Sequence, residues 1–157
     1  MSRTLQLRLA YNGERFSGWQ IQPDQRTVQG VLRDAIQNIC GETVIPKGSS
    51  RTDAGVHAAD QVASFTTSST YTPDVWRRAL NAHLPKDVVV LRSSDVHPSF
   101  NPTTEAVTKR YRYRIHDGEV RPVLARPFVW QWNSRLDVSA MQKASTLLIG
   151  EHDFSSF

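Results

Sequence analysis

Hydrophobic positions near the N-terminus first follow the period of a strand and then that of a helix. Three leucines alternate with polar residues and predict a β-strand: Leu5, Leu7 and Leu9. Farther along, apolar residues recur every three or four positions, as on the buried face of a helix: Val28, Val31, Leu32, Ala35, Ile36 and Ile39. Thr27 can cap this helix and Gly41 can end it. The stretch 12–26 between the two elements holds Gly, Asn, Pro and Asp and predicts a loop.

The pattern continues with two strands, a second helix and a fourth strand. Residues 43–47 and 61–66 predict short strands. Thr72 and Pro73 open the second helix, because proline in the first turn lacks only an N–H that has no helical partner there. This helix places five apolar residues on one side: Val75, Trp76, Ala79, Leu80 and Leu84. The apolar run at 88–91 is suited to a central strand.

These elements give the order β-α-β-β-α-β over residues 3–94, which is the ferredoxin-like order and predicts an α+β fold class. Two further strands are predicted at 107–116 and 127–132, and Asp137 caps a third helix that Gly150 ends. Three side chains of that helix should point inward: Met141, Ala144 and Leu148. We therefore expect a ferredoxin-like unit followed by part of a second, similar unit.

Length and composition fit a soluble protein of one or two domains. The chain has 157 residues, 39% of them hydrophobic, and we assign 1–96 to a first half and 97–157 to an incomplete second half. No apolar run approaches the roughly 20 residues that span a bilayer. The N-terminus leads directly into a strand pattern, so we expect no signal peptide. Cys40 is the single cysteine, which excludes an intrachain disulfide; we expect a buried thiol and a cytoplasmic protein.

Positive charge is concentrated in residues 109–135. This segment holds seven Lys or Arg against two acidic residues, a net charge of +5, whereas the whole chain carries +4. Aromatic residues are interleaved with these charges: Tyr111, Tyr113, Phe128, Trp130 and Trp132. Arginine binds phosphate and flat rings stack on bases, so the segment is typical of an RNA-binding surface. The alternative is a solvated strand whose arginines face water.

The strongest candidate for chemistry is Asp53, which follows Arg51 at a spacing of two residues. Gly48 and Gly55 lie on either side and let the backbone turn sharply and approach a ligand. A neighbouring guanidinium favours the ionised form of a carboxylate, and an ionised carboxylate can act as a nucleophile or a base. The alternative is an ordinary surface turn, in which an Arg–Asp pair contributes little.

The segment from Arg51 to Ala58 (Arg-Thr-Asp-Ala-Gly-Val-His-Ala) resembles the active-site motif of the tRNA pseudouridine synthase A family. Other segments resemble motifs of this family in the same order along the chain: 9–13, 16–20, 27–30, 61–65, 109–113 and 150–157. Such a run of matches is far more specific than any one of them. The resemblance implies the pseudouridine synthase fold, in which two ferredoxin-like halves join their sheets around an active cleft.

The resemblance also implies a reaction, the isomerisation of uridine to pseudouridine in the anticodon stem-loop of tRNA. Asp53 would be the nucleophile, attacking either the sugar carbon or the pyrimidine ring, and Arg51 would orient it and help displace the flanking nucleotide. Because a uridine inside a stem is unreachable, the base must flip out. Tyr111 would stack on the flipped base from the cleft side; the alternative for this ring is an ordinary core position. The isomerisation exchanges no electrons with a partner, so the resemblance implies no cofactor and no metal.

Five other residues are candidate RNA contacts. Arg15, Trp19 and Gln20 belong to the loop that resembles the family's, and Arg110 and Arg112 flank the tyrosine. For Trp19, the role of a loop anchor is an equal alternative. The resemblance further implies tRNA as the partner and a homodimer in which one tRNA touches both subunits.

Two departures from the family pattern qualify these expectations. Ser99 stands where the family commonly has an arginine, and prolines lie on both sides of it, so the family's RNA contact at this position does not carry over to this chain. Family members also continue beyond the motif at 150–157, so we expect this chain by itself to be weakly active or inactive. Two alternatives therefore remain: an inactive truncated synthase, and a non-catalytic RNA-binding module of ferredoxin-like fold that stacks bases on Tyr111 and Tyr113.

Other chemistries have less support in the sequence. The five histidines are scattered without the spacing of zinc ligands. Asp53 and Asp60 could form a carboxylate pair for glycoside hydrolysis, but no sugar-stacking pattern accompanies them. The sequence has no glycine-rich phosphate loop of the GxxxxGK[ST] type.

Overall fold

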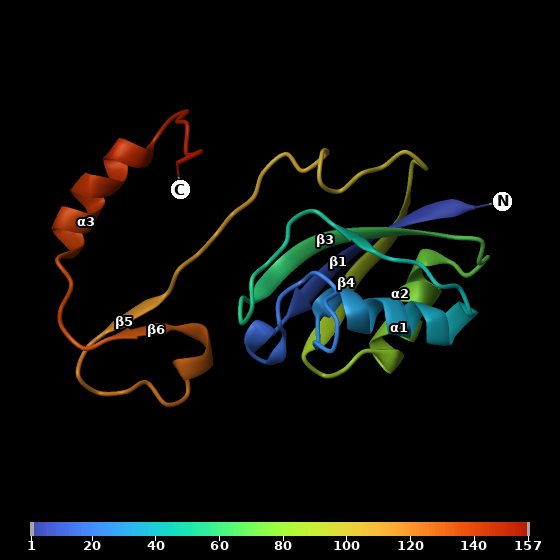
Figure 1. The fold of residues 1–157 in the computed structure, drawn as a ribbon, viewed down its shortest axis with the longest axis horizontal. Helices are drawn as coiled ribbons and strands as arrows, with labels where there is room; N and C mark the ends of the chain where they lie inside the picture. Colours follow the sequence, from blue (N-terminus) through green and yellow to red (C-terminus); the bar gives the residue numbers. More distant parts are fainter. Residues whose placement is uncertain (1, 157) are drawn as a thin grey trace. The chain divides into compact units, whose positions relative to one another are not determined.

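A four-stranded antiparallel sheet organises the first part of the chain (Figure 1) in the computed structural model, which describes residues 2–156. The strands lie in the order β2-β3-β1-β4. Their bounds are β1 (Arg3–Tyr11), β2 (Lys47–Gly48), β3 (Ala58–Thr67) and β4 (Val88–Val96). Helix α1 (Val28–Cys40) connects β1 to β2, and α2 (Pro73–His83) connects β3 to β4. This is the ferredoxin-like arrangement, and the predicted α+β class is confirmed.

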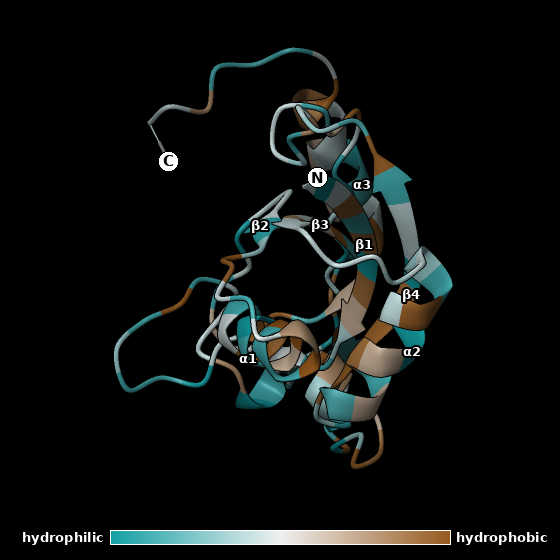
Figure 2. Ribbon diagram, turned by 90° about the vertical axis from the view of Figure 1, so that its right-hand side faces the viewer, coloured by the Kyte–Doolittle hydropathy of each residue, from teal (hydrophilic) through white to brown (hydrophobic). Residues whose placement is uncertain are grey.

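The core lies between one face of this sheet and the two helices, which are on the same side of it (Figure 2). Leu5, Leu7 and Leu9 are completely buried, as their alternation predicts. The register of β1 with β3 sets Leu5 opposite Phe65 and Leu7 opposite Ala63. The helices contribute fully buried side chains to the same cluster: Val28, Leu32, Ile36, Trp76 and Leu80.

The helix ends follow the capping residues that the sequence supplies. The Thr27 side chain accepts a hydrogen bond from the Gly30 N–H, and Gly41 ends α1 in the left-handed region at φ 76°. The Thr72 side chain accepts from the Val75 N–H, and Pro73 occupies the first turn of α2. The predicted limits of the first helix and the predicted start of the second are therefore confirmed.

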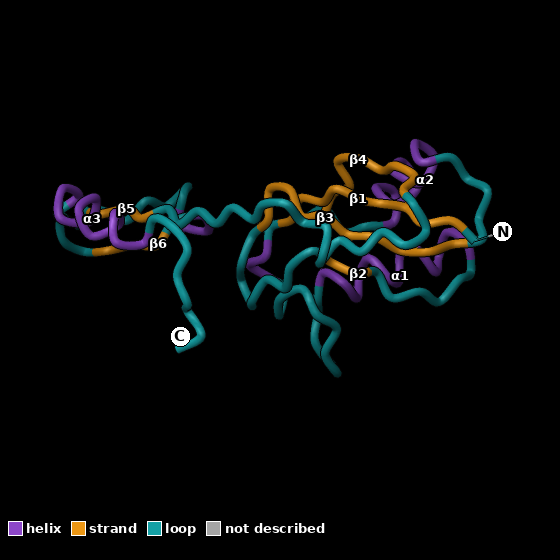
Figure 3. Tube along the Cα trace, turned by 90° about the horizontal axis from the view of Figure 1, so that it is seen from above, coloured by secondary structure: helices purple, strands orange, loops and turns teal. Residues whose placement is uncertain are grey.

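Three predicted strands are shorter in the structure than the sequence pattern suggested. Of residues 43–47, only Lys47 is in a strand, within β2. Of residues 107–116, only Ile115 and His116 are, in β5 (Ile115–Asp117); the connection from β4 to β5 is otherwise loop (Figure 3). Of residues 127–132, the strand β6 contains Trp130–Trp132, after a 3-10 turn at Arg126–Phe128. Alternating side chains favour a strand, but hydrogen bonding to a neighbour is what makes one.

The chain divides into two compact units, one ending at Arg110 and the other starting at Tyr111. The segment 97–110, which we assigned to the second half, therefore belongs to the first unit. Two hydrogen bonds attach it there: the Thr4 hydroxyl donates to the Pro98 carbonyl at 3.4 Å, and the Thr103 hydroxyl to the Gly48 carbonyl at 3.1 Å.

The second unit contains a two-stranded parallel sheet of β5 and β6 and the helix α3 (Val138–Ser145). Asp137 caps α3 as predicted, accepting a hydrogen bond from the Ala140 N–H. The prediction that Met141, Ala144 and Leu148 point inward is wrong, because all three are exposed; the exposed fraction of Leu148 is 65%. A helical spacing of apolar residues shows which face could be buried, but not that another layer covers it.

Candidate active site

The loop from Ser49 to His57 joins β2 to β3 and is tied to β3 at its beginning. The Ser49 N–H donates to the Val62 carbonyl at 2.8 Å. The side-chain amide of Gln61 donates to the Ser50 carbonyl at 2.6 Å, and Gln61 is buried. We call residues 49–57 the candidate loop. These bonds fix the first residues of the loop, 49 and 50, against β3. The positions of the later residues depend on other contacts.

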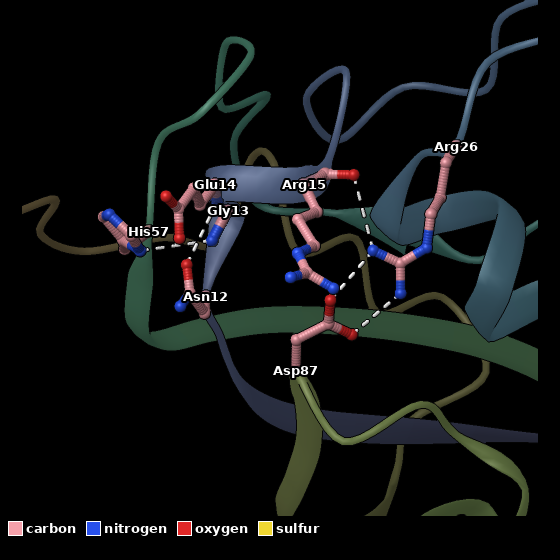
Figure 4. Close-up of polar contacts among 7 residues, drawn as sticks. All are labelled: Asn12, Gly13, Glu14, Arg15, Arg26, His57 and Asp87. Carbon is pink, nitrogen blue, oxygen red and sulfur yellow. Dashed lines mark hydrogen bonds and ion pairs between the residues drawn. The ribbon is translucent and has the colours of Figure 1, made fainter. Parts of the chain in front are cut away.

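The loop that follows β1 supplies these contacts to residues 52–57. The Trp19 N–H donates to the Thr52 carbonyl at 2.9 Å, and the Gly55 N–H donates to the Phe16 carbonyl at 3.1 Å. The Gly13 N–H donates to His57 Nδ1 at 3.2 Å (Figure 4). These bonds lie on both sides of Asp53 and make the two loops one hydrogen-bonded layer.

Two glycines outside the predicted motif make this close approach possible. A Cβ atom on Gly13 would lie 2.0 Å from the Val56 carbonyl oxygen, and one on Gly18 would lie 2.6 Å from the Thr52 carbonyl oxygen. Gly18 also has φ +87°, a conformation that side chains rarely adopt. Both lie in segments 9–13 and 16–20, which resemble the family, but the sequence alone does not show that these positions need glycine. That need becomes visible only when the loops meet.

Asp53 is exposed at a turn in this layer. Its backbone carbonyl accepts a hydrogen bond from the Val56 N–H at 3.2 Å, and Gly55 supplies the left-handed residue of the turn at φ +79°. Arg51 is exposed as well, and within residues 2–156 the two side chains form no ion pair with each other. The expected orienting contact between Arg51 and Asp53 is therefore not part of this structure, and the role of Arg51 stays a prediction.

Tyr11, at the end of β1, contacts the candidate loop through Thr52. The sequence pattern did not single out this residue. Its ring is 5% exposed at the end of β1, and its phenol oxygen lies 2.8 Å from the hydroxyl oxygen of Thr52. Burial raises the pKa of the Tyr11 phenol above its ordinary value, although the hydrogen bond to Thr52 acts in the opposite direction. The phenol therefore keeps its proton and can donate it to the threonine next to Asp53.

Trp19 serves as an anchor for the same layer. Its side chain is 1% exposed and packs against Gly48, where an added Cβ would lie 2.6 Å from the indole ring. The ring is tilted against that of Tyr11 at a centroid distance of 6.5 Å. This burial agrees with the loop-anchor alternative and leaves almost no side-chain surface for an RNA contact. By contrast, Arg15 is exposed and Gln20 is half-buried.

The other predicted site residues belong to the segment around the unit boundary. Arg110, Tyr111 and Arg112 are exposed, Tyr111 by 67%. Tyr111 is the first residue of the second unit, so its pairing with Asp53 stays a prediction. Exposed arginines and rings are expected both of an RNA-binding surface and of a solvated segment, so RNA binding by 109–135 stays a prediction.

Among residues 2–156, no three side chains of His, Cys, Asp or Glu gather as a metal site would require. In the same residues, no helix has the length and apolar character needed to cross a bilayer. Cys40 is half-buried rather than buried, and its thiol donates to the Ile36 carbonyl at 3.3 Å.

The chain is similar to proteins of one enzyme family. The sequence model of a family described as tRNA pseudouridine synthase matches residues 9–102, which include the candidate loop. A tRNA pseudouridine synthase A of Halalkalibacterium halodurans is 45% identical over 96% of this chain and 58% of its own length. The proteins of that name from Pelobacter propionicus and Shouchella clausii are 42% and 45% identical, over 64% and 60% of their lengths. The chain thus spans less than two thirds of these relatives.

Proposed function

Because this chain belongs to the tRNA pseudouridine synthase family, we propose that it carries the catalytic loop of an enzyme that isomerises uridine to pseudouridine in tRNA. The observation that carries the proposal is the setting of Asp53. Its carboxylate is exposed, whereas hydrogen bonds hold the backbone before and after it. A reacting group needs access to its substrate and a fixed position, and this loop provides both.

Asp53 is the nucleophile in this proposal. The reaction breaks the bond between the ribose C1′ and N1 of uracil, and the base rejoins C1′ through its C5, which finally loses a proton to N1. Asp53 either bonds to C1′ and holds the sugar while the base turns, or adds to the pyrimidine ring and activates it. In both routes the carboxylate is released at the end, so that atoms and electrons balance without a co-reactant.

The target base has to leave its stem, at a cost of a few kcal/mol for unstacking. We propose that Arg51 takes part in this displacement and that Tyr111 stacks on the flipped base. The exposed, basic segment 109–135 would bind the anticodon stem-loop. From the family membership we further propose tRNA as partner, a homodimer and a cytoplasmic location, and we retain a first half that carries the catalytic loop and a second half that faces the RNA.

The test is the conversion of an unmodified tRNA transcript by the 157-residue chain, measured by carbodiimide labelling and primer extension. Asp53→Asn should abolish the product while the affinity for the transcript stays within about twofold, since an interaction made only in the transition state is lost. The matched control is Asp60→Asn. Asp60 is also an exposed carboxylate, in strand β3 three residues after the candidate loop, but it forms an ion pair with Arg8.

A non-catalytic RNA-binding module remains the second candidate, because large rings of the second unit are exposed: Tyr113 by 89% and Trp130 by 58%. In that case the chain binds tRNA but forms no product, and Asp53→Asn changes nothing. An inactive truncated synthase, the other alternative, gives the same outcome. Product formation that survives in Asp53→Asn would instead show that another residue is the nucleophile. A chain that binds no tRNA contradicts both candidates.

A further inference from the structure

A surface depression of about 480 Å³ lies where the loop after β1 meets the turn between α2 and β4. Its lining includes six polar and charged residues: Asn12, Glu14, Arg15, Arg26, Lys86 and Asp87 (Figure 4 shows all but Lys86). None of them belongs to the candidate loop, and only Arg15 was identified from the sequence. The depression is therefore a separate feature next to the proposed active site.

Arg26 and Asp87 form a fixed part of this lining. The Arg26 guanidinium donates two hydrogen bonds to the Asp87 carboxylate, both at 2.8 Å, and a third, at 3.4 Å, to the Arg15 carbonyl. Its carbon Cζ lies 4.0 Å from the centroid of the buried Phe16 ring. The Asp87 carbonyl accepts from the Asn12 N–H at 2.9 Å. A forked ion pair with this many additional contacts is held in one geometry.

The cations of the depression outnumber its carboxylates. Arg15, Arg26 and Lys86 stand against Glu14 and Asp87. Arg15 extends toward Asp87 (Figure 4) but is not within ion-pair distance of it, and the side chains of Arg15 and Lys86 form no hydrogen bond or ion pair with the other described residues. Both are exposed. Two exposed cations that share this lining with a fixed guanidinium are suited to a bound anion.

The depression and the candidate loop share one backbone segment. Residues 13–16 contact the candidate loop through Gly13, which donates to His57, and through Phe16, which accepts from Gly55. The same segment contributes Glu14 and Arg15 to the depression. A polyanion that reaches Asp53 therefore lies near this cationic lining, because residues 13–16 contact the candidate loop and also line the depression.

We propose that the depression binds a backbone phosphate of the RNA substrate, close to the nucleotide that Asp53 attacks. Arg15 and Lys86 are the phosphate ligands, and Arg26 is kept in place by Asp87 and presents its remaining edge. The inference rests on the proposed function, since it takes the bound polyanion to be the tRNA. Such a contact adds affinity and fixes the position of the RNA on the protein, but it does not distinguish one base from another.

The experiment measures binding of an unmodified tRNA transcript to the whole chain over a range of salt concentrations. Arg15→Gln with Lys86→Gln should weaken binding by about tenfold at low salt and reduce the slope of log K against log salt by about one. The matched control is Arg33→Gln with Arg78→Gln, which removes the same charge from the helices, where these arginines pair with Asp34 and Asp74. The control should change affinity by no more than about twofold.

The outcomes separate this inference from the proposed function. If the unsubstituted chain binds no tRNA, both fail. If it binds and converts tRNA but the two double variants behave alike, only the depression is excluded as an RNA site. A titration with inorganic phosphate, followed by the NMR signals of the Asn12 and Asp87 amides, tests whether the depression binds a free anion instead of RNA. Phosphate binding that Arg15→Gln with Lys86→Gln abolishes, without any effect on tRNA, would identify a site for a free anion and overturn the proposal.

Discussion

The phenol oxygen of Tyr11 lies 2.8 Å from the hydroxyl oxygen of Thr52, although 41 positions separate the two residues in the sequence. Tyr11 is the last residue of a central strand, and Thr52 directly precedes Asp53. This contact connects the rigid sheet to the side of the turn that presents the carboxylate. The candidate loop is therefore positioned from the sheet as well as by its neighbouring loop.

Tyr11→Phe should reveal how much this contact contributes. The substitution keeps the buried ring but leaves the half-buried Thr52 hydroxyl without its partner, so we expect a loss of about 1 kcal/mol in the free energy of unfolding. Urea unfolding followed by circular dichroism measures it. If the loop position matters for the reaction, product formation on tRNA should fall more than tRNA affinity. A variant as stable as the unsubstituted chain would show that the hydrogen bond contributes nothing.

Gly18→Ala tests the close approach of the two loops. Gly18 has φ +87° and lies where a Cβ would meet the Thr52 carbonyl oxygen at 2.6 Å, so alanine causes both backbone strain and a clash with backbone. We expect a loss of about 2 to 4 kcal/mol, more than the roughly 1 kcal/mol of the left-handed conformation alone.

Gly41→Ala is the matched control for that prediction. Gly41 has a similar φ of +76°, but no atom lies within 4 Å of its Cβ position. The difference between the two variants in urea unfolding isolates the clash from the strain. Equal losses would mean that the loop after β1 moves away from the candidate loop at little cost.

The parts of this fold that the sequence predicted well are those determined by local rules. Thr27 and Thr72 cap their helices through residues three positions away, and Leu5, Leu7 and Leu9 are buried because a strand alternates its faces. The order of these elements then restricts the sheet to few topologies. The turn that presents Asp53 follows a local rule as well, since Asp53 and Gly55 lie within its four residues.

What the sequence could not provide are contacts between distant segments. The strand predicted at 107–116 fails over most of its length because a ladder needs a partner, which no local pattern reveals. Trp19 could be an RNA contact or an anchor until the structure placed Gly48 against its ring. No sequence pattern singles out Lys86 and Asp87, because they become part of a charged lining only where they meet Arg15 and Arg26.

The ion pair of Arg26 and Asp87 should make part of the stability depend on pH. The hydrogen bonds from Arg26 lower the pKa of the Asp87 carboxyl below its ordinary value of 3.8, and Arg15 adds a smaller electrostatic effect. A carboxyl whose pKa is lower in the folded state stabilises the fold above its unfolded pKa, and this contribution is lost as the pH falls through the folded pKa. The unfolding free energies of the unsubstituted chain and Asp87→Asn should therefore differ at pH 6. The difference should begin to shrink once the pH falls below about 4, near the unfolded pKa, and should disappear only below the folded pKa.

A double-mutant cycle assigns this effect to the pair. Arg26→Gln should remove the same pH-dependent difference, and Asp87→Asn should add little to it in the double variant. If the difference between the unsubstituted chain and Asp87→Asn persists unchanged in the Arg26→Gln background, the carboxylate is stabilised by something other than this guanidinium.

His57 is expected to act as a positioning residue through its Nδ1 atom, which accepts the Gly13 N–H at 3.2 Å. An imidazole that accepts at Nδ1 carries its proton on Nε2. The loop therefore requires a hydrogen-bond acceptor at this position and does not require a positive charge. Asn can offer a side-chain oxygen in a similar place, whereas Ala cannot. His57→Ala should therefore lower kcat for pseudouridine formation by about tenfold with little change in KM, and His57→Asn should restore much of it. A rise in KM in both variants, at unchanged kcat, would instead assign His57 to RNA binding, because uniform substrate binding would then be what is lost.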